Sequence, residues 1–206
     1  MQNPFENEER RAFRETVRRY VETRITPDAD EWDEAGDFPW EVHEELGAMG
    51  YFGFGVSDAH GGLGFDDAFM RAAAAEELAR CGATGVWAGV GGRSISIGPL
   101  EHFASEAIRD RVLEDVVLGR KGSCLAITEP GGGSDVANLK TTAVRDGDEY
   151  VINGSKTFIT GGMKGQYFVV GARTGGPGLG GISLFFVEEG TPGFTRTALE
   201  LSLIHI

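Results

Sequence analysis

The chain has 206 residues, and its 19 basic and 32 acidic side chains give a formal net charge of −13. An acidic chain lacks the clustered Lys and Arg that bind nucleic acid or an anionic membrane, so we expect neither partner. Apolar residues make up 41% of the chain, enough for a packed core, whereas Cys81 and Cys124 are too few for a disulfide framework or a four-cysteine zinc site.

The first half of the chain is predicted to be helical. Apolar residues recur at steps of three and four over residues 4–26, which predicts an amphipathic helix that Pro27 ends. Three further helices are predicted over residues 39–49, 66–80 and 105–118, the last with Ser105 as its cap. The alanine run at 72–75 predicts close packing against another helix. The apolar, glycine-rich segment 83–99 is predicted to be a buried helix.

After residue 121 the pattern becomes that of strands. Asp146-Gly147-Asp148 lies between the strand-like segments 143–145 and 149–152, and Asn153-Gly154-Ser155 precedes another at 156–160. Asp-Gly and Asn-Gly between such segments are strong hairpin signals, because Gly and Asn tolerate a positive φ. Further strands are predicted at 167–172, 182–187 and 194–199. The boundary between the two halves is predicted near residues 120–122.

The segment most indicative of function is a short apolar strand that opens into a glycine loop, Cys124 to Asp135. The chain's 32 glycines are roughly twice the usual share of ~7%, and three of them are consecutive here, Gly131 to Gly133. Amides without side chains make anion-binding concavities, and Ser134 adds a hydroxyl donor, so the loop suits a phosphate or another electron-rich ligand. The spacing is not that of a P-loop, and a simple glycine-rich turn capped by Thr128 and Ser134 remains the alternative.

Two motifs in this half resemble those of the FAD-dependent acyl-CoA dehydrogenases. The first is Ile127-Thr-Glu-Pro-Gly-Gly-Gly-Ser-Asp135, and the second is Val151-Ile-Asn-Gly-Ser-Lys-Thr-Phe-Ile-Thr-Gly-Gly162. Upstream, Ala59-His-Gly-Gly-Leu-Gly64, Ala75-Glu-Glu-Leu78 and His102-Phe-Ala-Ser-Glu106 also match the family's pattern in order. The resemblance therefore covers the chain from about residue 5 to about residue 199.

The resemblance implies an α+β, multi-domain fold. An all-α N-terminal domain would cover residues 1–121, and an antiparallel, β-barrel-like middle domain residues 122–200. The family's C-terminal helical bundle is expected to be absent from this chain, as in a truncated reading frame, with 201–206 as a non-native tail. In the family the flavin ring lies between the middle domain and that bundle, so we expect this chain alone to bind FAD weakly and to be inactive.

Site residues follow from the resemblance as well. Thr128 would bond the polar edge of the flavin, Phe158 would form an aromatic wall against the ring, and Thr160 would lie near the nitrogen that accepts hydride. Ser134 would also contact the acyl-CoA. The full set of residues expected to bind the cofactor is Leu125, Ile127, Thr128, Gly133, Ser134, Phe158, Ile159 and Thr160. Taken alone, Thr128, Thr160 and Phe158 are ordinary strand or core residues, and only the joint motif assigns them to the flavin.

The reaction implied is α,β-dehydrogenation of an acyl-CoA thioester, a fatty acid β-oxidation step, with electrons passed to an electron-transfer flavoprotein. The family's catalytic base is a glutamate in the C-terminal bundle, so no catalytic residue is assigned here. Glu129 and Asp135 are expected to have structural roles at the turn. His43, His60 and His102 lack metal-ligand spacing, so no metal is expected. An acyl-CoA oxidase or flavin monooxygenase of the same fold, or a non-enzymatic binding protein, are the alternatives.

The full-length protein is expected to be a homo-oligomer, a dimer or tetramer. No signal peptide is recognisable in the first residues, and no apolar stretch approaches the ~20 residues that span a bilayer. We therefore expect a cytoplasmic protein in a bacterium or, in a eukaryote, a protein of the mitochondrial matrix after loss of a leader.

Overall fold

A computed structural model describes residues 5–199 of the chain, without the side chains of Arg93 and Ser94. The chain forms two compact units, a helical unit (Met1–Arg120) and a sheet unit (Lys121–Ile206). The expected order of an all-α part followed by a β part is confirmed. Every helix in residues 5–199 is too short or too polar to cross a lipid bilayer.

The first helical segment continues past the point where it was expected to end. Helix α1 (Glu8–Tyr20) begins at Asn7, whose side chain accepts a hydrogen bond from the Arg10 amide at 2.8 Å. A π-helical turn (Val21–Ile25), a 3₁₀ turn (Thr26–Asp28) and helix α2 (Ala29–Ala35) follow. The expectation that Pro27 ends the helix was wrong: Pro27 lies in the first turn of the 3₁₀ segment, where its missing N–H costs nothing.

The other predicted helices are confirmed within a few residues. They are α3 (Glu41–Ala48), α4 (Ala68–Ala79), α5 (Thr84–Phe103) and α6 (Glu106–Val117). Asp67 caps α4 by accepting from the Phe69 and Met70 amides at 2.9 and 3.0 Å, whereas Ser105 takes the cap position of α6 without a side-chain bond. The expectation of a buried helix at 83–99 is wrong in part, because Trp87 and Ile95 are exposed.

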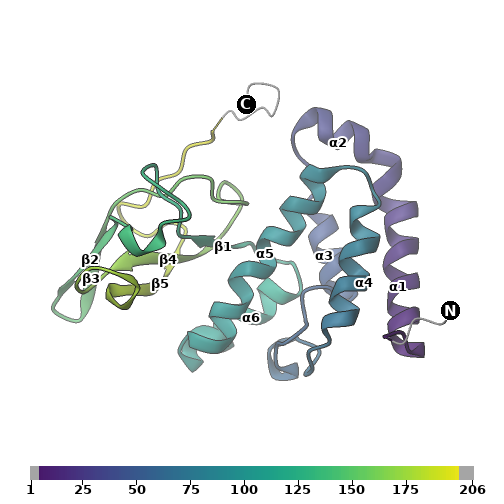
Figure 1. Ribbon diagram of the computed structural model, residues 1–206, viewed down its shortest axis with the longest axis horizontal. Helices are drawn as coiled ribbons and strands as arrows, with labels where there is room; N and C mark the ends of the chain where they lie inside the picture. Colours follow the sequence, from purple (N-terminus) through teal and green to yellow (C-terminus); the bar gives the residue numbers. More distant parts are fainter. Residues whose placement is uncertain (1–4, 200–206) are drawn as a thin grey trace. The chain divides into compact units, whose positions relative to one another are not determined.

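Helix α1 packs along α4 (Figure 1), and a buried carboxylate joins them. Ala73 and Ala74 of the alanine run are buried, as expected for close helix packing. Next to them Glu77, only 2% exposed, accepts from Arg14 at 3.0 Å and from Arg18 at 2.7 and 2.9 Å. The hydrogen bond from Arg18 is the main reason that the pKa of Glu77 is lowered to about 2, against the opposing effect of burial.

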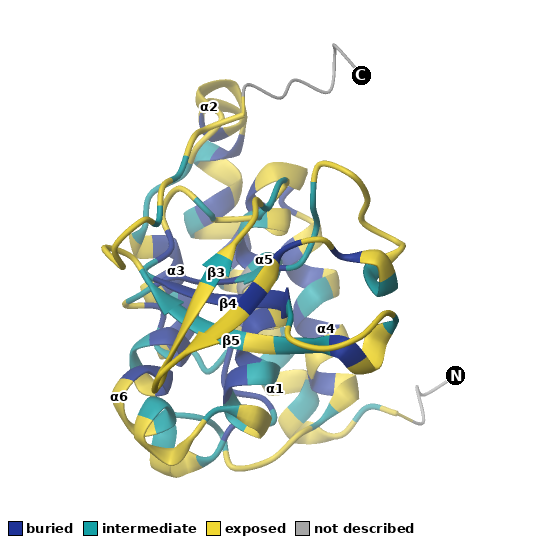
Figure 2. Cartoon of the chain, turned by 90° about the vertical axis from the view of Figure 1, so that its left-hand side faces the viewer, coloured by how far each residue is buried: buried dark blue, intermediate teal, exposed yellow. Residues whose placement is uncertain are grey.

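The sheet unit is organised around one central strand. Strand β4 (Tyr167–Arg173) pairs in parallel with β1 (Ser123–Ala126) and antiparallel with β5 (Ile182–Glu188). The hairpin of β2 (Thr142–Asp146) and β3 (Glu149–Asn153) forms at Asp146-Gly147-Asp148, as predicted, and joins β4 at the Thr142–Arg173 pair. Residues 167–172 are all buried, and Figure 2 shows β4 in dark blue between more exposed strands.

Two details of the predicted β domain were wrong. The sheet is mixed rather than antiparallel, and its described strands do not close into a barrel. Residues 156–160 and 194–199 are not strands. The first is instead bonded to the glycine loop and contains Phe158 with φ of +56°, which no strand accommodates. Residues 201–206, expected to be a non-native tail, lie outside the described residues.

The core of the sheet unit explains which way β1 faces. Cys124 and Ala126 pack with Phe168 and Val170 of β4, and Ile159, Val187 and Phe194 cover this cluster. Side chains alternate along a strand, so Leu125 points to the opposite face of the sheet, where it is half-buried. Cys124 itself is only 1% exposed.

The role of Glu77 can be tested by Glu77→Gln, which leaves Arg14 and Arg18 without their shared carboxylate. We expect the helical unit to lose about 3 kcal/mol of unfolding free energy, as when a buried ion pair loses one partner. Trp32, Trp40 and Trp87 all lie in the helical unit, so tryptophan fluorescence during urea unfolding reports it. Glu76→Gln is the control, because Glu76 also pairs with Arg14 but is 65% exposed and should cost less than about 1 kcal/mol. Equal losses in the two variants would contradict the assignment.

Candidate functional site

The glycine loop after β1 is a closed turn that leaves several amides available. Glu129 and Gly132 exchange both backbone hydrogen bonds, at 3.1 and 3.0 Å, with Pro130 and Gly131 at the tip. Within residues 5–199, the amides of Gly131, Gly133 and Ser134 donate to no other group, and all three residues are exposed. The loop therefore presents free N–H donors on an accessible surface.

The fold of this chain does not explain why the loop is built from glycine. None of the three glycines has a positive φ. A Cβ on Gly131 or Gly132 would meet no atom within 4 Å, and one on Gly133 would make an ordinary contact with Thr128 at 3.4 Å. A side chain would fit, so the open backbone is useful only to a partner outside the chain. A pyrophosphate group fits such a cradle of amides.

A cavity of about 110 Å³ adjoins this cradle. It is lined by Ile127, Glu129, Gly131, Gly132, Gly133, Asp135, Val136, Asn138, Leu139 and Lys140. Lys140 was not singled out from the sequence, since a lysine in a polar segment carries no signal of its own. It is the one cation of this lining, beside the carboxylates of Glu129 and Asp135.

A buried ion pair holds the loop against the second motif. The Glu129 carboxylate accepts from Lys156 Nζ at 2.9 Å, from the Thr141 amide and hydroxyl at 2.8 and 2.5 Å, and from the Lys140 amide at 2.7 Å. The side chains of Glu129 and Lys156 are both 10% exposed. Lys156 also donates to the Ile127 carbonyl at 3.0 Å, so one ammonium binds two points of the loop.

The electrostatics of this pair exclude Glu129 as a general base. Burial alone would raise the pKa of Glu129, but hydrogen bonds from Thr141, Lys156 and two amides outweigh it and lower the pKa to about 2. A carboxylate held this firmly in its charged form is a poor proton acceptor near neutral pH. The expected structural role of Glu129 at the turn agrees with this geometry.

Phe158 adopts a strained conformation beside the loop. The Thr157 amide donates to the Thr128 carbonyl at 2.9 Å, which brings the two motifs into direct contact. Phe158 follows with φ of +56°, the one positive φ of a non-glycine residue within residues 5–199, and its ring is 64% exposed. A bulky residue in this region costs of order 1–3 kcal/mol, and such outliers cluster at functional sites.

The remaining predicted site residues separate into two groups. The hydroxyls of Thr128, Ser134 and Thr160 bond to no other group within residues 5–199 and remain available to a ligand. The Ile159 side chain instead packs on the core cluster, so it anchors the segment rather than lining an open surface. The motif alone assigned Ile159 and Phe158 to the same site, whereas the structure packs Ile159 on the core and leaves Phe158 exposed.

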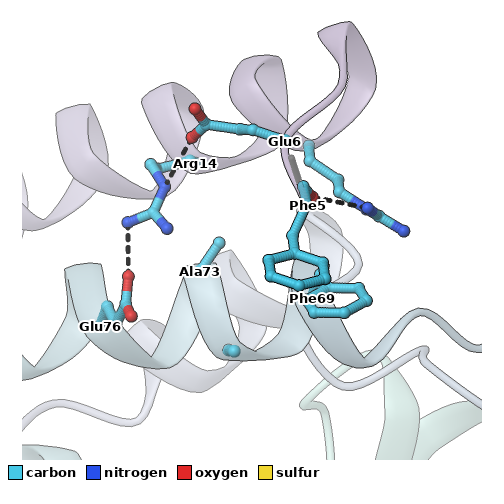
Figure 3. A pocket seen from close by; sticks show the side chains of 8 residues that line it. Phe5, Glu6, Arg14, Phe69, Ala73 and Glu76 are labelled. Atoms are coloured by element: carbon cyan, nitrogen blue, oxygen red, sulfur yellow. Dashed lines mark hydrogen bonds and ion pairs between the residues drawn. The ribbon is translucent and has the colours of Figure 1, made fainter. Parts of the chain in front are cut away.

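A second cavity, of about 120 Å³, lies between α1 and α4 in the helical unit. Figure 3 shows Arg14 reaching from α1 between Glu6 and Glu76, and the Phe5 ring stacked on that of Phe69. Arg14 lies 3.6 Å from Glu6 and 2.7 Å from Glu76, and the two ring centres are 4.8 Å apart. The charged groups at this cavity are engaged in ion pairs, Arg14 with Glu6 and Glu76 and Arg10 with Asp67 outside the lining. No group of three or more potential metal ligands occurs within residues 5–199.

Known proteins match the chain over nearly its whole length. The acyl-CoA dehydrogenase N-terminal domain matches residues 7–120, and the acyl-CoA dehydrogenase middle domain matches residues 124–203. Mitochondrial isobutyryl-CoA dehydrogenase of Bos taurus is 34% identical over 189 residues, which make up 92% of this chain and 45% of that protein.

Solved structures show the same similarity. A probable acyl-CoA dehydrogenase from Mycobacterium abscessus is 37% identical with a TM-score of 0.88, over 94% of this chain and 52% of that one. A glutaryl-CoA dehydrogenase from Mycobacterium smegmatis, solved in complex with FADH2, is 30% identical with a TM-score of 0.88, over 97% of this chain and 50% of that one. The chain thus spans about half the length of these relatives.

The pKa of Glu129 predicts how acid affects the sheet unit. A carboxylate whose pKa is lowered in the folded state stabilises the fold above its unfolded pKa, here about 4.5, and loses that contribution as pH falls towards 2. We expect protection of the β4 amides from hydrogen exchange to fall between pH 5 and pH 3, and Glu129→Gln to flatten this dependence. Glu149→Gln, at an exposed position on β3, is the control and should keep the wild-type profile. A Glu129→Gln chain with the wild-type pH dependence would contradict the prediction.

Proposed function

The chain belongs to the acyl-CoA dehydrogenase family, and we propose that its sheet unit forms part of an FAD site for the α,β-dehydrogenation of an acyl-CoA thioester. The observation that carries this proposal is the glycine loop, whose open backbone has no explanation within the chain itself. Bound FAD would supply the acceptor for the hydride and the electrons that leave the substrate.

Each exposed group of the site has a defined task in this proposal. The amides of Gly131, Gly133 and Ser134 would donate to the pyrophosphate. The hydroxyls of Thr128 and Thr160 would bond the polar edge of the flavin, and the exposed ring of Phe158 would lie against its flat face. Leu125 and Ile127, both half-buried, would add apolar contact.

Ser134 would also bind the acyl-CoA. The base that removes the α-proton of the substrate is proposed to be a residue other than Glu129. With its pKa near 2 and its oxygens engaged by Lys156, Thr141 and Lys140, Glu129 is unsuited to remove the α-proton. We propose a glutamate beyond residue 206 as the base, and an electron-transfer flavoprotein as the electron acceptor. We further propose a homo-oligomer in a bacterial cytoplasm or a mitochondrial matrix.

Gly131→Leu tests the cradle directly. Because a Cβ there meets nothing within 4 Å, the melting temperature should stay within about 2 °C of wild type, while the affinity for FAD falls at least ten-fold. The measurement is a titration of the chain with FAD, followed by the shift of the flavin absorbance bands. Gly176→Leu is the control, since Gly176 is equally open but lies in the loop before β5. Equal FAD affinity in the two variants would place the ligand elsewhere.

The reaction class is tested in the full-length protein. Butyryl-CoA or palmitoyl-CoA should bleach the absorbance of the bound flavin under anaerobic conditions. Slow recovery of the absorbance on admission of air indicates a dehydrogenase, and fast recovery indicates an oxidase or monooxygenase.

Phe158→Gly should weaken FAD binding without lowering the unfolding free energy of the sheet unit. Glycine accepts φ of +56° without strain, so we expect the sheet unit to keep its unfolding free energy or gain up to about 1 kcal/mol. The loss of the ring should weaken FAD binding about ten-fold. Phe158→Tyr retains the ring and should bind FAD like wild type with no gain in stability. A Phe158→Gly chain that is destabilised and binds FAD normally would show that the ring serves the core.

A further inference from the structure

Arg196 binds the turn that follows Thr160. Its Nη1 atom donates to the carbonyl oxygens of Gly162, Met163 and Gly165, at 3.1, 3.3 and 2.8 Å. Its Nη2 atom pairs with Glu189, at the end of β5, at 2.8 Å. One guanidinium therefore connects the turn to the sheet.

Aromatic rings orient this guanidinium. Its central carbon lies 5.7 Å from the ring centre of Phe168 and 5.8 Å from that of Phe194, and both rings belong to or pack on the core cluster. With Glu189 on one side and two rings nearby, the guanidinium is partly desolvated, and its hydrogen bonds are correspondingly stronger. Residues 194–199 do not form the expected strand, so they contribute the side-chain hydrogen bonds of Arg196 and not the backbone hydrogen bonds of a sheet.

The turn directly precedes β4, and Gln166 at its end exchanges hydrogen bonds with Gly122. The amides of Lys164 and Gly165 donate to the Gly161 carbonyl at 3.0 and 2.8 Å, and Gly161 has φ of +72°. Carbonyls outside a helix or sheet still require donors: Gln166 Nε2 serves that of Lys164 at 3.0 Å, and Arg196 serves those of Gly162, Met163 and Gly165. The planar fork of an arginine serves several carbonyls at once, whereas a lysine ammonium is a compact point charge.

The flavin-facing segment lies between two fixed points. At its start, Lys156 and Thr157 are bonded to the glycine loop, and at its end the turn is bonded to Arg196. Phe158 and Thr160 lie between these points, so their direction depends on both. We propose that Arg196 is a positioning residue that holds this turn and thereby sets how the Phe158 ring and the Thr160 hydroxyl meet the flavin. The inference rests on the proposed function, which assigns that segment to the flavin.

Arg196→Lys tests the inference through hydrogen exchange of the full 206-residue chain. We expect the Lys164 and Gly165 amides, which close the turn, to exchange about ten times faster, while the β4 amides keep their wild-type rates. Arg145→Lys is the matched control, because Arg145 also donates to a carbonyl, that of Gly147 at 2.9 Å, on the β2–β3 hairpin. It should leave the Lys164 and Gly165 amides unchanged.

FAD titration of the same variants gives a second readout. We expect the dissociation constant to rise about ten-fold in Arg196→Lys, with a changed absorbance spectrum of the bound flavin, and to stay unchanged in Arg145→Lys. Unchanged exchange at Lys164 and Gly165, or faster exchange throughout β4, would overturn the inference, as would unchanged FAD affinity and spectrum. If the wild-type chain leaves the FAD spectrum unaltered, the exchange data alone decide the role of Arg196, and the proposed function fails only if the full-length protein does not bind FAD either.

Discussion

The ion pair of Glu129 and Lys156 is the contact on which the site of the sheet unit depends. Each side chain is 10% exposed, so neither charge could remain there alone, and their separation of 2.9 Å brings together segments 27 residues apart in sequence. Glu129 also accepts from the Lys140 amide and from the Thr141 amide and hydroxyl, and Lys156 also donates to the Ile127 carbonyl, so four further groups bond to these two charges. The loop and the second motif therefore form one structure.

Around this ion pair, the polar groups proposed to contact the flavin make no hydrogen bond in the described part of the chain. The amides of Gly131 and Gly133 and the hydroxyls of Thr128 and Thr160 bond to nothing else within residues 5–199, and the Phe158 ring is exposed on a strained backbone. By contrast, Cys124, Ala126, Phe168 and Val170 form the buried core of the sheet unit. Local departures from good packing and relaxed geometry mark a site shaped for a ligand.

Irregular chain in this unit is stabilised by arginines. Arg196 binds three carbonyls of the turn at 162–165, and Arg173 binds the carbonyls of Ala137, Leu139, Gly176 and Gly178. A segment without a partner strand must still satisfy its backbone, and a guanidinium does so at several points. In the helical unit the same residue type has another task, because Arg14 and Arg18 neutralise the buried Glu77 between α1 and α4.

The sequence by itself determined the features that depend on neighbouring residues. Apolar spacing placed five helices, Asp146-Gly147-Asp148 placed the hairpin, and two short motifs identified the family and most of the candidate site. Only the tertiary structure decided that residues 156–160 are not a strand, because Lys156 pairs with a distant Glu129 and Phe158 takes a positive φ. It likewise decided that the chain continues past Pro27 into α2, that residues 194–199 form no strand, and that β1 and β4 run parallel. Periodicity records which face of an element is apolar, but a buried charge or a strained φ depends on a partner far away in the chain.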